Sequence, residues 1–174
     1  MIACRMRQPD KGKRHERGSA MKNLTPQQQL DGFIDKFTPD IAAQARALIA
    51  AMSSRLPGSS VLVYDNYNAL AIGFAPGERT SDAIFSLAVF PRWVSLFFLK
   101  NALALEDPAD LLKGSGSVVR HIVLKTPDML DLPPIKKLMK QALRLADPPL
   151  DPAQPMQLII KSISAKQRPR RPAS

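Results

Sequence analysis

The sequence predicts an α+β fold in which a small antiparallel sheet of about five to six strands packs against two N-terminal helices and one C-terminal helix. Three observations lead to this prediction. Apolar residues recur at helical spacing in two segments near the start and one near the end. Between them lie β-forming runs separated by Gly, Pro, Asn and Asp. The 174 residues are enough for one domain with its own hydrophobic core.

Two helices are expected first. Thr25–Pro26 and Thr38–Pro39 each combine an N-cap residue with a proline in the first helical position. The first helix is predicted over residues 25–37, and the second runs from Thr38 to the residues before "LPGSS". Both carry an apolar stripe at spacings of three and four, which is typical of a helix that packs on a core.

Four strands are expected next, as two hairpins. The run "VLVYDNYNALAIGFAP" turns around Asn66–Asn68, residue types that tolerate turn geometry. The runs "AIFSLAVF" and "RWVSLFFL" flank Pro91, which has no backbone N–H to donate and therefore favours a bend or an edge.

The last part of the domain is predicted to hold two more strands and a helix. A short helical turn is expected at residues 108–112, and "VVRHIVLK" follows as a fifth strand. In "DLPPIKKLMKQALRLAD" apolar side chains occupy one helical face and Lys/Arg the other. "MQLIIKSIS" is predicted to be a final edge strand. Because exposed strand edges invite pairing, a homodimer remains an open alternative.

The formal charge of +10 is confined to the two ends of the chain. Residues 1–22 carry seven Lys/Arg and two Asp/Glu, residues 161–174 carry five Lys/Arg and no acid, and residues 23–160 hold thirteen of each. We therefore expect a basic disordered tail over residues 1–22, one domain over 23–163 and a basic flexible tail over 164–174. Met21 directly precedes the first helix signal, and we expect it to be the natural start of the protein.

Basic tails attract phosphate without sequence preference and in a salt-dependent way. The candidate nucleic-acid contacts in the C-terminal tail are Lys166, Arg168, Arg170 and Arg171. The commoner role of such charge is solubility. Non-specific association with nucleic acid through the tails is therefore kept as an alternative function.

The stretch "KGSGSVVRH" is the candidate for binding an anion. It is no P-loop, because the glycines lead into a predicted strand and the lysine precedes them. We expect Gly114 and Gly116 to supply positive φ or a close approach in the turn. In the functional interpretation, the amides of residues 114–117 form a small anion nest with Lys113 and Arg120.

Three other side chains are candidates for a ligand cleft, which we expect between the sheet and the helices. Tyr64 and Trp93 lie in or beside predicted strands, and His121 is the only histidine outside the N-terminal tail. His121 is expected to be structural, with a general base as the alternative. No catalytic residue, cofactor or metal site is predicted, since neither a second histidine nor a cysteine accompanies His121 in the core.

Cysteine usage and hydropathy set the expected location. Cys4 is the only cysteine and lies in the N-terminal tail, so the core has no disulfide. The N-terminus shows no apolar region of a signal peptide, and no run approaches the roughly 18 apolar residues of a membrane-spanning helix. We expect a cytoplasmic protein without a membrane contact.

Four phrases carry a family resemblance: "VYDNYNALAIGF", "SDAIFSLAVFPRWVSLFFL", "DPADLLKGSGSVVRHIVL" and "IIKSISAKQRPRRP". In this order they resemble the bacterial YdhG-like proteins, domain of unknown function 1801, over roughly residues 25–170. The resemblance implies an α+β domain whose glycine turn leads into a strand, and it supplies no catalytic residue. Many members carry a "YGMP"-like phrase in the first strand, where this chain has "VYDNYNALA".

The expected function is a non-enzymatic module that binds a small ligand or an anion. One relative in the resembled family is described as a frataxin-like iron chaperone, and this role is a further alternative. It fits the chain poorly, because iron delivery favours an acidic face and residues 23–160 are balanced in charge. An enzyme that uses His121 as a base is the remaining hypothesis.

Overall fold

Both predicted helix starts are present in the computed structural model, which describes residues 24–172. Helix α2 (Pro26–Ile34) begins with a capping box, in which Thr25 Oγ1 accepts from the Gln28 amide at 3.2 Å and Gln28 Oε1 accepts from the Thr25 amide at 2.9 Å. Helix α3 spans Pro39–Arg55. α2 ends earlier than predicted because Thr38, which precedes a proline, is extended and the chain must turn before it.

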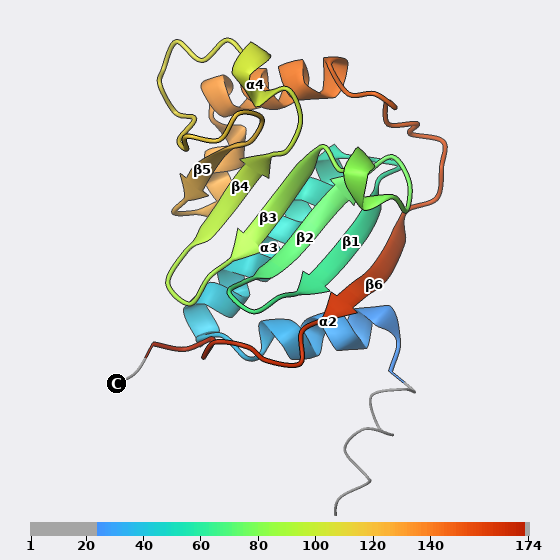
Figure 1. The fold of residues 1–174 in the computed structure, drawn as a ribbon, viewed down its shortest axis with the longest axis vertical. Helices are drawn as coiled ribbons and strands as arrows, with labels where there is room; N and C mark the ends of the chain where they lie inside the picture. Colours follow the sequence, from blue (N-terminus) through green and yellow to red (C-terminus); the bar gives the residue numbers. More distant parts are fainter. Residues whose placement is uncertain (1–23, 173–174) are drawn as a thin grey trace, which may run out of the picture.

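The strands form one six-stranded sheet in the order β5-β4-β3-β2-β1-β6 (Figure 1). They are β1 (Ser60–Asp65), β2 (Leu70–Ala75), β3 (Phe85–Val89), β4 (Val94–Phe98), β5 (Arg120–Leu124) and β6 (Gln157–Ile163). The first five pair with their sequence neighbours in antiparallel register, which confirms both hairpins. β6 lies at an edge, as predicted.

β6 pairs with β1 in parallel, so the sheet is mixed rather than wholly antiparallel. After β5 the chain passes through helix α4 (Pro133–Arg144) and crosses to the opposite edge of the sheet. It then enters β6 in the direction of β1 (Figure 1). A hairpin turn forces the next strand to run antiparallel to its neighbour, whereas a long crossover allows a parallel pair.

Short 3₁₀ turns connect these elements: η2 (Thr80–Asp82), η3 (Ala102–Ala104) and η4 (Pro127–Asp131). The helical turn predicted at residues 108–112 is absent from that segment, and the turn lies at η3 instead. Among residues 24–172 there is no helix that is both long and apolar enough to cross a membrane. The predicted tail over residues 1–22, with Cys4 and Met21, lies outside the described residues.

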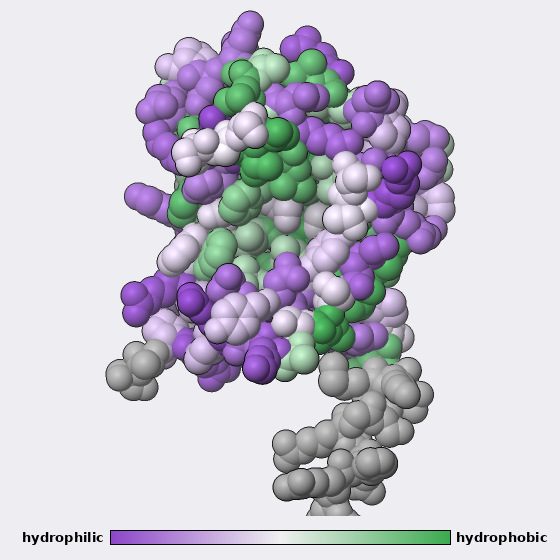
Figure 2. Space-filling view, viewed as in Figure 1, coloured by the Kyte–Doolittle hydropathy of each residue, from purple (hydrophilic) through white to green (hydrophobic). Residues whose placement is uncertain are grey.

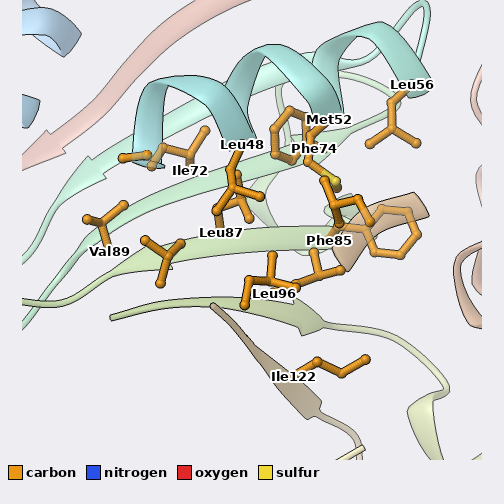
Figure 3. Packing of buried hydrophobic residues seen from close by; sticks show 14 of the residues in the cluster. Leu48, Met52, Leu56, Ile72, Phe74, Phe85, Leu87, Val89, Leu96 and Ile122 are labelled. Carbon is orange, nitrogen blue, oxygen red and sulfur yellow. The ribbon is translucent and has the colours of Figure 1, made fainter. Parts of the chain in front are cut away.

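The main core lies between α3 and one face of the sheet. Figure 3 shows Leu48 and Met52 of α3, and Leu56 directly after its last residue, facing large apolar side chains of the central strands. On the strands every second residue belongs to this core, for example Leu87 of β3 and Leu96 of β4, both fully buried. α4 adds its own apolar face to the same cluster, through Ile135, Leu138 and Met139.

Candidate functional site

The predicted anion site at the glycine turn is brought together by backbone pairing. The Lys113 amide donates to the His121 carbonyl at 2.8 Å, and the His121 amide donates back to Lys113 at 2.9 Å. Gly114 has a φ of 119°, so the prediction of a positive φ is confirmed there. A Cβ at Gly114 would lie 3.5 Å from Nδ1 of His121, an ordinary contact distance, so the positive φ alone is the reason for glycine.

The two cations of this turn are already engaged. The Arg120 guanidinium donates to the carbonyls of Gly116 and Val119. The Lys113 ammonium donates to the carbonyl of Asp110 at 2.6 Å and to its carboxylate at 2.8 Å. An anion at the turn would have to compete with these partners, and Asp110 would repel it. The geometry therefore favours a self-bonded turn over an anion nest.

The remaining predicted residues, Tyr64, Trp93 and His121, lie toward the face of the sheet opposite α3, which we call the free face. Strand alternation places Tyr64 and His121 on this face, because their neighbours Val63 and Ile122 belong to the main core on the other face. Trp93 directly precedes β4 and stacks on Phe90, with ring centroids 5.0 Å apart. The main core fills the space between α3 and the central strands, so these three side chains do not line a cleft between the sheet and the helices.

These three side chains do not converge on one point. Tyr64 lies in β1 and His121 in β5, four strands or about 19 Å apart across the sheet. The Tyr64 hydroxyl lies 2.6 Å from the hydroxyl of Thr80. The His121 ring stacks on Phe97, with centroids 5.1 Å apart and planes inclined by 25°. The aromatic groups thus stand around the free face and leave its centre to other residues.

The centre of the free face is a floor of small residues. Ala71, Ala88 and Ser95 lie side by side on β2, β3 and β4, and Gly73 pairs with Ser86 in the neighbouring row. We call this floor, together with Tyr64 at the β1 side and Phe97 at the β4 side, the free-face trough. Figure 2 shows the middle of this face recessed and coloured from white to green, with purple side chains around much of its rim.

One end of the free face is covered by the chain itself. The segment between β2 and β3, which contains η2, places Ala83 over Leu62 and Ala75 in a small second cluster. Tyr64 and Leu99 pack against this cluster. The trough is therefore closed at the end near η2 and flanked by Phe90 and Trp93 near the β3–β4 turn.

The trough suits binding rather than acid–base or metal chemistry. Its floor offers apolar surface and the hydroxyl of the partly exposed Ser86, which makes one long contact of 3.4 Å to the carbonyl of Leu87, whereas Ser95 is buried. Across residues 24–172, no group of three or more His, Cys, Asp or Glu side chains is placed to hold a metal ion. A ligand here would be held by contact area and by a few hydrogen bonds.

The floor residues were missed by the sequence interpretation, which followed aromatic and charged side chains. A signal was present, because "LAIGFA" and "FSLAV" alternate large with small residues, and "VSLFF" does so except at Phe97. In a sheet, this pattern places the large members on one face and most of the small ones on the other.

The C-terminal segment is packed on the domain rather than extended into solvent. The Arg168 amide donates to the Tyr67 carbonyl at 2.9 Å, and its guanidinium lies over the Tyr67 ring. Arg171 Nε donates to the Phe37 carbonyl at 3.1 Å. Lys166 is exposed, and its carbonyl accepts a hydrogen bond from Ser164. Residues 164–172 thus contact the domain at several points, whereas the charge pattern alone predicts a flexible tail.

Arg170 is the clearest departure from the predicted nucleic-acid contacts. Its side chain is 3% exposed and pairs at 2.9 Å with Asp65, which is 1% exposed. Lys36 contacts the other Asp65 oxygen at 2.6 Å. Because the Arg170 guanidinium is enclosed, it does not face solvent where a phosphate would bind. A buried charge needs such a partner, and this pair explains why the segment is fixed.

Comparison of the chain with models of known protein families, with curated proteins and with solved structures found no match.

Proposed function

We propose that this protein is a non-enzymatic binding module that holds a small, flat, largely apolar ligand in the free-face trough. The observation that carries the proposal is the registered floor of Ala71, Gly73, Ser86, Ala88 and Ser95 between the aromatic side chains of Tyr64 and Phe97. Large side chains at these positions would fill the face. Small ones leave Ala71 and Ser86 partly exposed, so a ligand can lie against β2 and β3 beside Phe97.

The chemistry of the surroundings defines the ligand class. Phe97 and Trp93 present aromatic surface beside the floor, and each already takes part in a stacked pair. A ring system fits such surroundings because aromatic groups gain from edge and offset contacts as well as from burial. The hydroxyl of the partly exposed Ser86 suits a ligand with one polar atom.

The geometry supports this ligand class better than an anion at the glycine turn. Lys113 and Arg120 have protein partners there, whereas the trough floor has no charged side chain on β2, β3 or β4. The nucleic-acid alternative draws on Arg170, whose guanidinium is buried. A role for the exposed Lys166 and Arg168 in such binding stays a prediction.

The test is a titration with 2-naphthol, a flat apolar probe with a single hydroxyl, monitored by ¹H–¹⁵N spectra of the full chain. We expect saturable shifts at amides of β2, β3 and β4 around Ala88. Ala88→Phe, which fills the floor, should weaken binding by at least about tenfold. Its side chain points away from the main core, so the variant is expected to fold.

Ala47→Phe is the matched control, because Ala47 is exposed on α3 at the other side of the sheet. This variant should bind the probe as the unmodified chain does. Equal affinity for the Ala88→Phe variant, or shifts confined to other elements, would contradict the proposal. The affinities of Ala88→Phe and of the unmodified chain are compared only after the variant's amide spectrum shows the dispersion of a folded protein.

The family and the location belong to this proposal as well. The quoted phrases support a YdhG-like domain, and a binding role is compatible with a family resemblance that brings no catalytic residue. A cytoplasmic location is supported by the single cysteine of the sequence.

A further inference from the structure

A second concave site lies on the helix side of the molecule, between α2, α3 and the start of β6. It is a pocket of about 450 Å³, a volume typical of small-molecule sites. In Figure 1, α2 lies across the end of the sheet whereas α3 runs behind its central strands. The two helices diverge from the turn at Asp35–Thr38, and β1 and β6 form the back wall of the pocket.

The pocket has an apolar interior. Leu30 and Ile34 of α2 and Ile49 of α3 face Val61 of β1 and Leu158 of β6. Met156 also lines it and is 44% exposed. Within residues 24–172 no strand or helix lies beyond the edge strand β6, and an apolar ligand chain would cover the exposed parts of Ile49, Met156 and Leu158.

Arg46 places a positive charge at the boundary of this pocket. It also lines a neighbouring hollow of about 540 Å³, together with Arg171 and Asp35. Arg46 pairs with Asp35 at 2.6 Å, but their side chains are 41% and 68% exposed. Such an exposed ion pair contributes little to stability, so a ligand anion can replace Asp35 as the partner of Arg46.

The other polar groups limit the charge of that ligand. Asp31 lines the pocket and accepts a hydrogen bond from Gln27 at 3.2 Å. With Asp35 nearby, a doubly charged head group would meet two carboxylates. A single carboxylate matches the planar guanidinium in a paired hydrogen-bonding geometry and adds one negative charge only.

We propose that this pocket binds an amphiphilic monocarboxylate, with the apolar chain between α2 and α3 and the carboxylate on Arg46. The site is separate from the free-face trough, because the main core and the sheet lie between them. The proposal is therefore independent of the function proposed for the trough.

The test is calorimetric titration of the full chain with decanoate below its micellar concentration. We expect saturable binding to one site. Arg46→Gln should weaken it by about tenfold or more, since a charge-assisted hydrogen bond is lost. Ala50→Phe, at an exposed position in the pocket wall, should abolish it. Decanol should bind the unmodified chain more weakly than decanoate does. Its affinity should be the same for the unmodified chain and for the Arg46→Gln variant.

Two controls separate this site from general effects. Ala47→Phe adds the same side chain to the same helix outside the pocket, and Arg79→Gln removes an arginine whose side chain is 81% exposed near η2. Both should bind decanoate as the unmodified chain does, and so should Ala88→Phe in the trough. Undiminished binding by folded Ala50→Phe, or the absence of saturable binding, would overturn the pocket. Undiminished binding by Arg46→Gln would overturn the head-group assignment.

Discussion

The two faces of the sheet are built by the same strands but carry side chains of different size. On β3 and β4 the helix side has Leu87 and Leu96, whereas the free side has Ala88 and Ser95. The contrast in size is larger than the contrast in charge, since neither face of these two strands carries an ionisable group. Side-chain volume, more than polarity, therefore distinguishes the face that makes the core from the face proposed to bind.

One residue breaks the apolar character of the helix-side face. Asp65 lies on the same face of β1 as Val61 and Val63, and it is fully buried. It accepts from Lys36, which follows α2, and from Arg170 of the C-terminal segment. The helix side is thus closed at this end by charge pairing across three distant parts of the chain, and elsewhere by apolar packing.

The largest expected effect is the loss of stability when the ion pair between Asp65 and Arg170 is broken. Asp65→Ala should lower the free energy of unfolding by about 3–5 kcal/mol, because it leaves the enclosed Arg170 guanidinium without a carboxylate. Urea denaturation of the variant and of the unmodified chain measures the difference.

The matched variant is Arg170→Met, which keeps much of the side-chain volume and leaves Asp65 paired with Lys36 at 2.6 Å. It should cost less than Asp65→Ala, and the double variant should cost less than the sum of the two. Additive losses would show that the two side chains do not interact in solution.

The next effect compares neighbouring residues on opposite faces. Leu87→Ala should cost about 2–5 kcal/mol, because Leu87 is fully buried in the main core and its loss leaves a cavity. Ser86→Ala on the free face should change stability by no more than about 0.5 kcal/mol. Thermal and urea unfolding of both variants give the comparison, and similar losses at the two positions would remove the distinction between the faces.

The smallest effect concerns an exposed ion pair at the far end of α3. The hydrogen bond from the Arg55 guanidinium, 2.6 Å away, and its charge lower the pKa of Asp131 below its ordinary value, with a smaller contribution from Lys136. A lowered carboxyl pKa adds stability above the unfolded pKa, and this contribution is lost as the pH falls through the folded pKa.

Arg55→Gln should therefore raise the pKa of Asp131 toward its ordinary value, and Lys136→Gln should raise it less. An NMR titration of the Asp131 carboxyl between about pH 2 and 6 measures both shifts. A larger shift of the Asp131 pKa in Lys136→Gln than in Arg55→Gln would contradict the assignment of Arg55 as the main cause.

The elements of the fold could be predicted wherever the signal is local. Thr25–Pro26 and Thr38–Pro39 identify both helix starts because proline restraint acts within one turn, and Thr25 adds a side-chain cap that Thr38 does not make. Asn66–Asn68 identify the first hairpin for the same reason. A short helical turn is expected at residues 108–112, whereas the structure has a 3₁₀ turn at residues 102–104, in a segment where neither capping nor a regular spacing guides the assignment.

The candidate site was only partly predictable. Tyr64, Trp93 and His121 were selected as single side chains, but which face they occupy follows from the pairing of strands with α3. Lys113 and Arg120 are cations in the sequence, and only the folded turn shows that Asp110 and two carbonyls engage them. The floor of the trough needs the register of three strands, since each contributes only one or two small residues.

Local patterns settle the helices, the two hairpins, the positive φ of Gly114 and the apolar residues of the core, because each depends on the nearest few residues or on burial alone. The parallel direction of β6, the burial of Arg170 against Asp65 and the pocket beside Arg46 depend on residues that are far apart in the chain. A basic segment is attractive to phosphate in the unfolded chain and becomes part of the core only when a buried carboxylate is placed beside it. That placement is decided by tertiary structure, which brings together charges 105 positions apart.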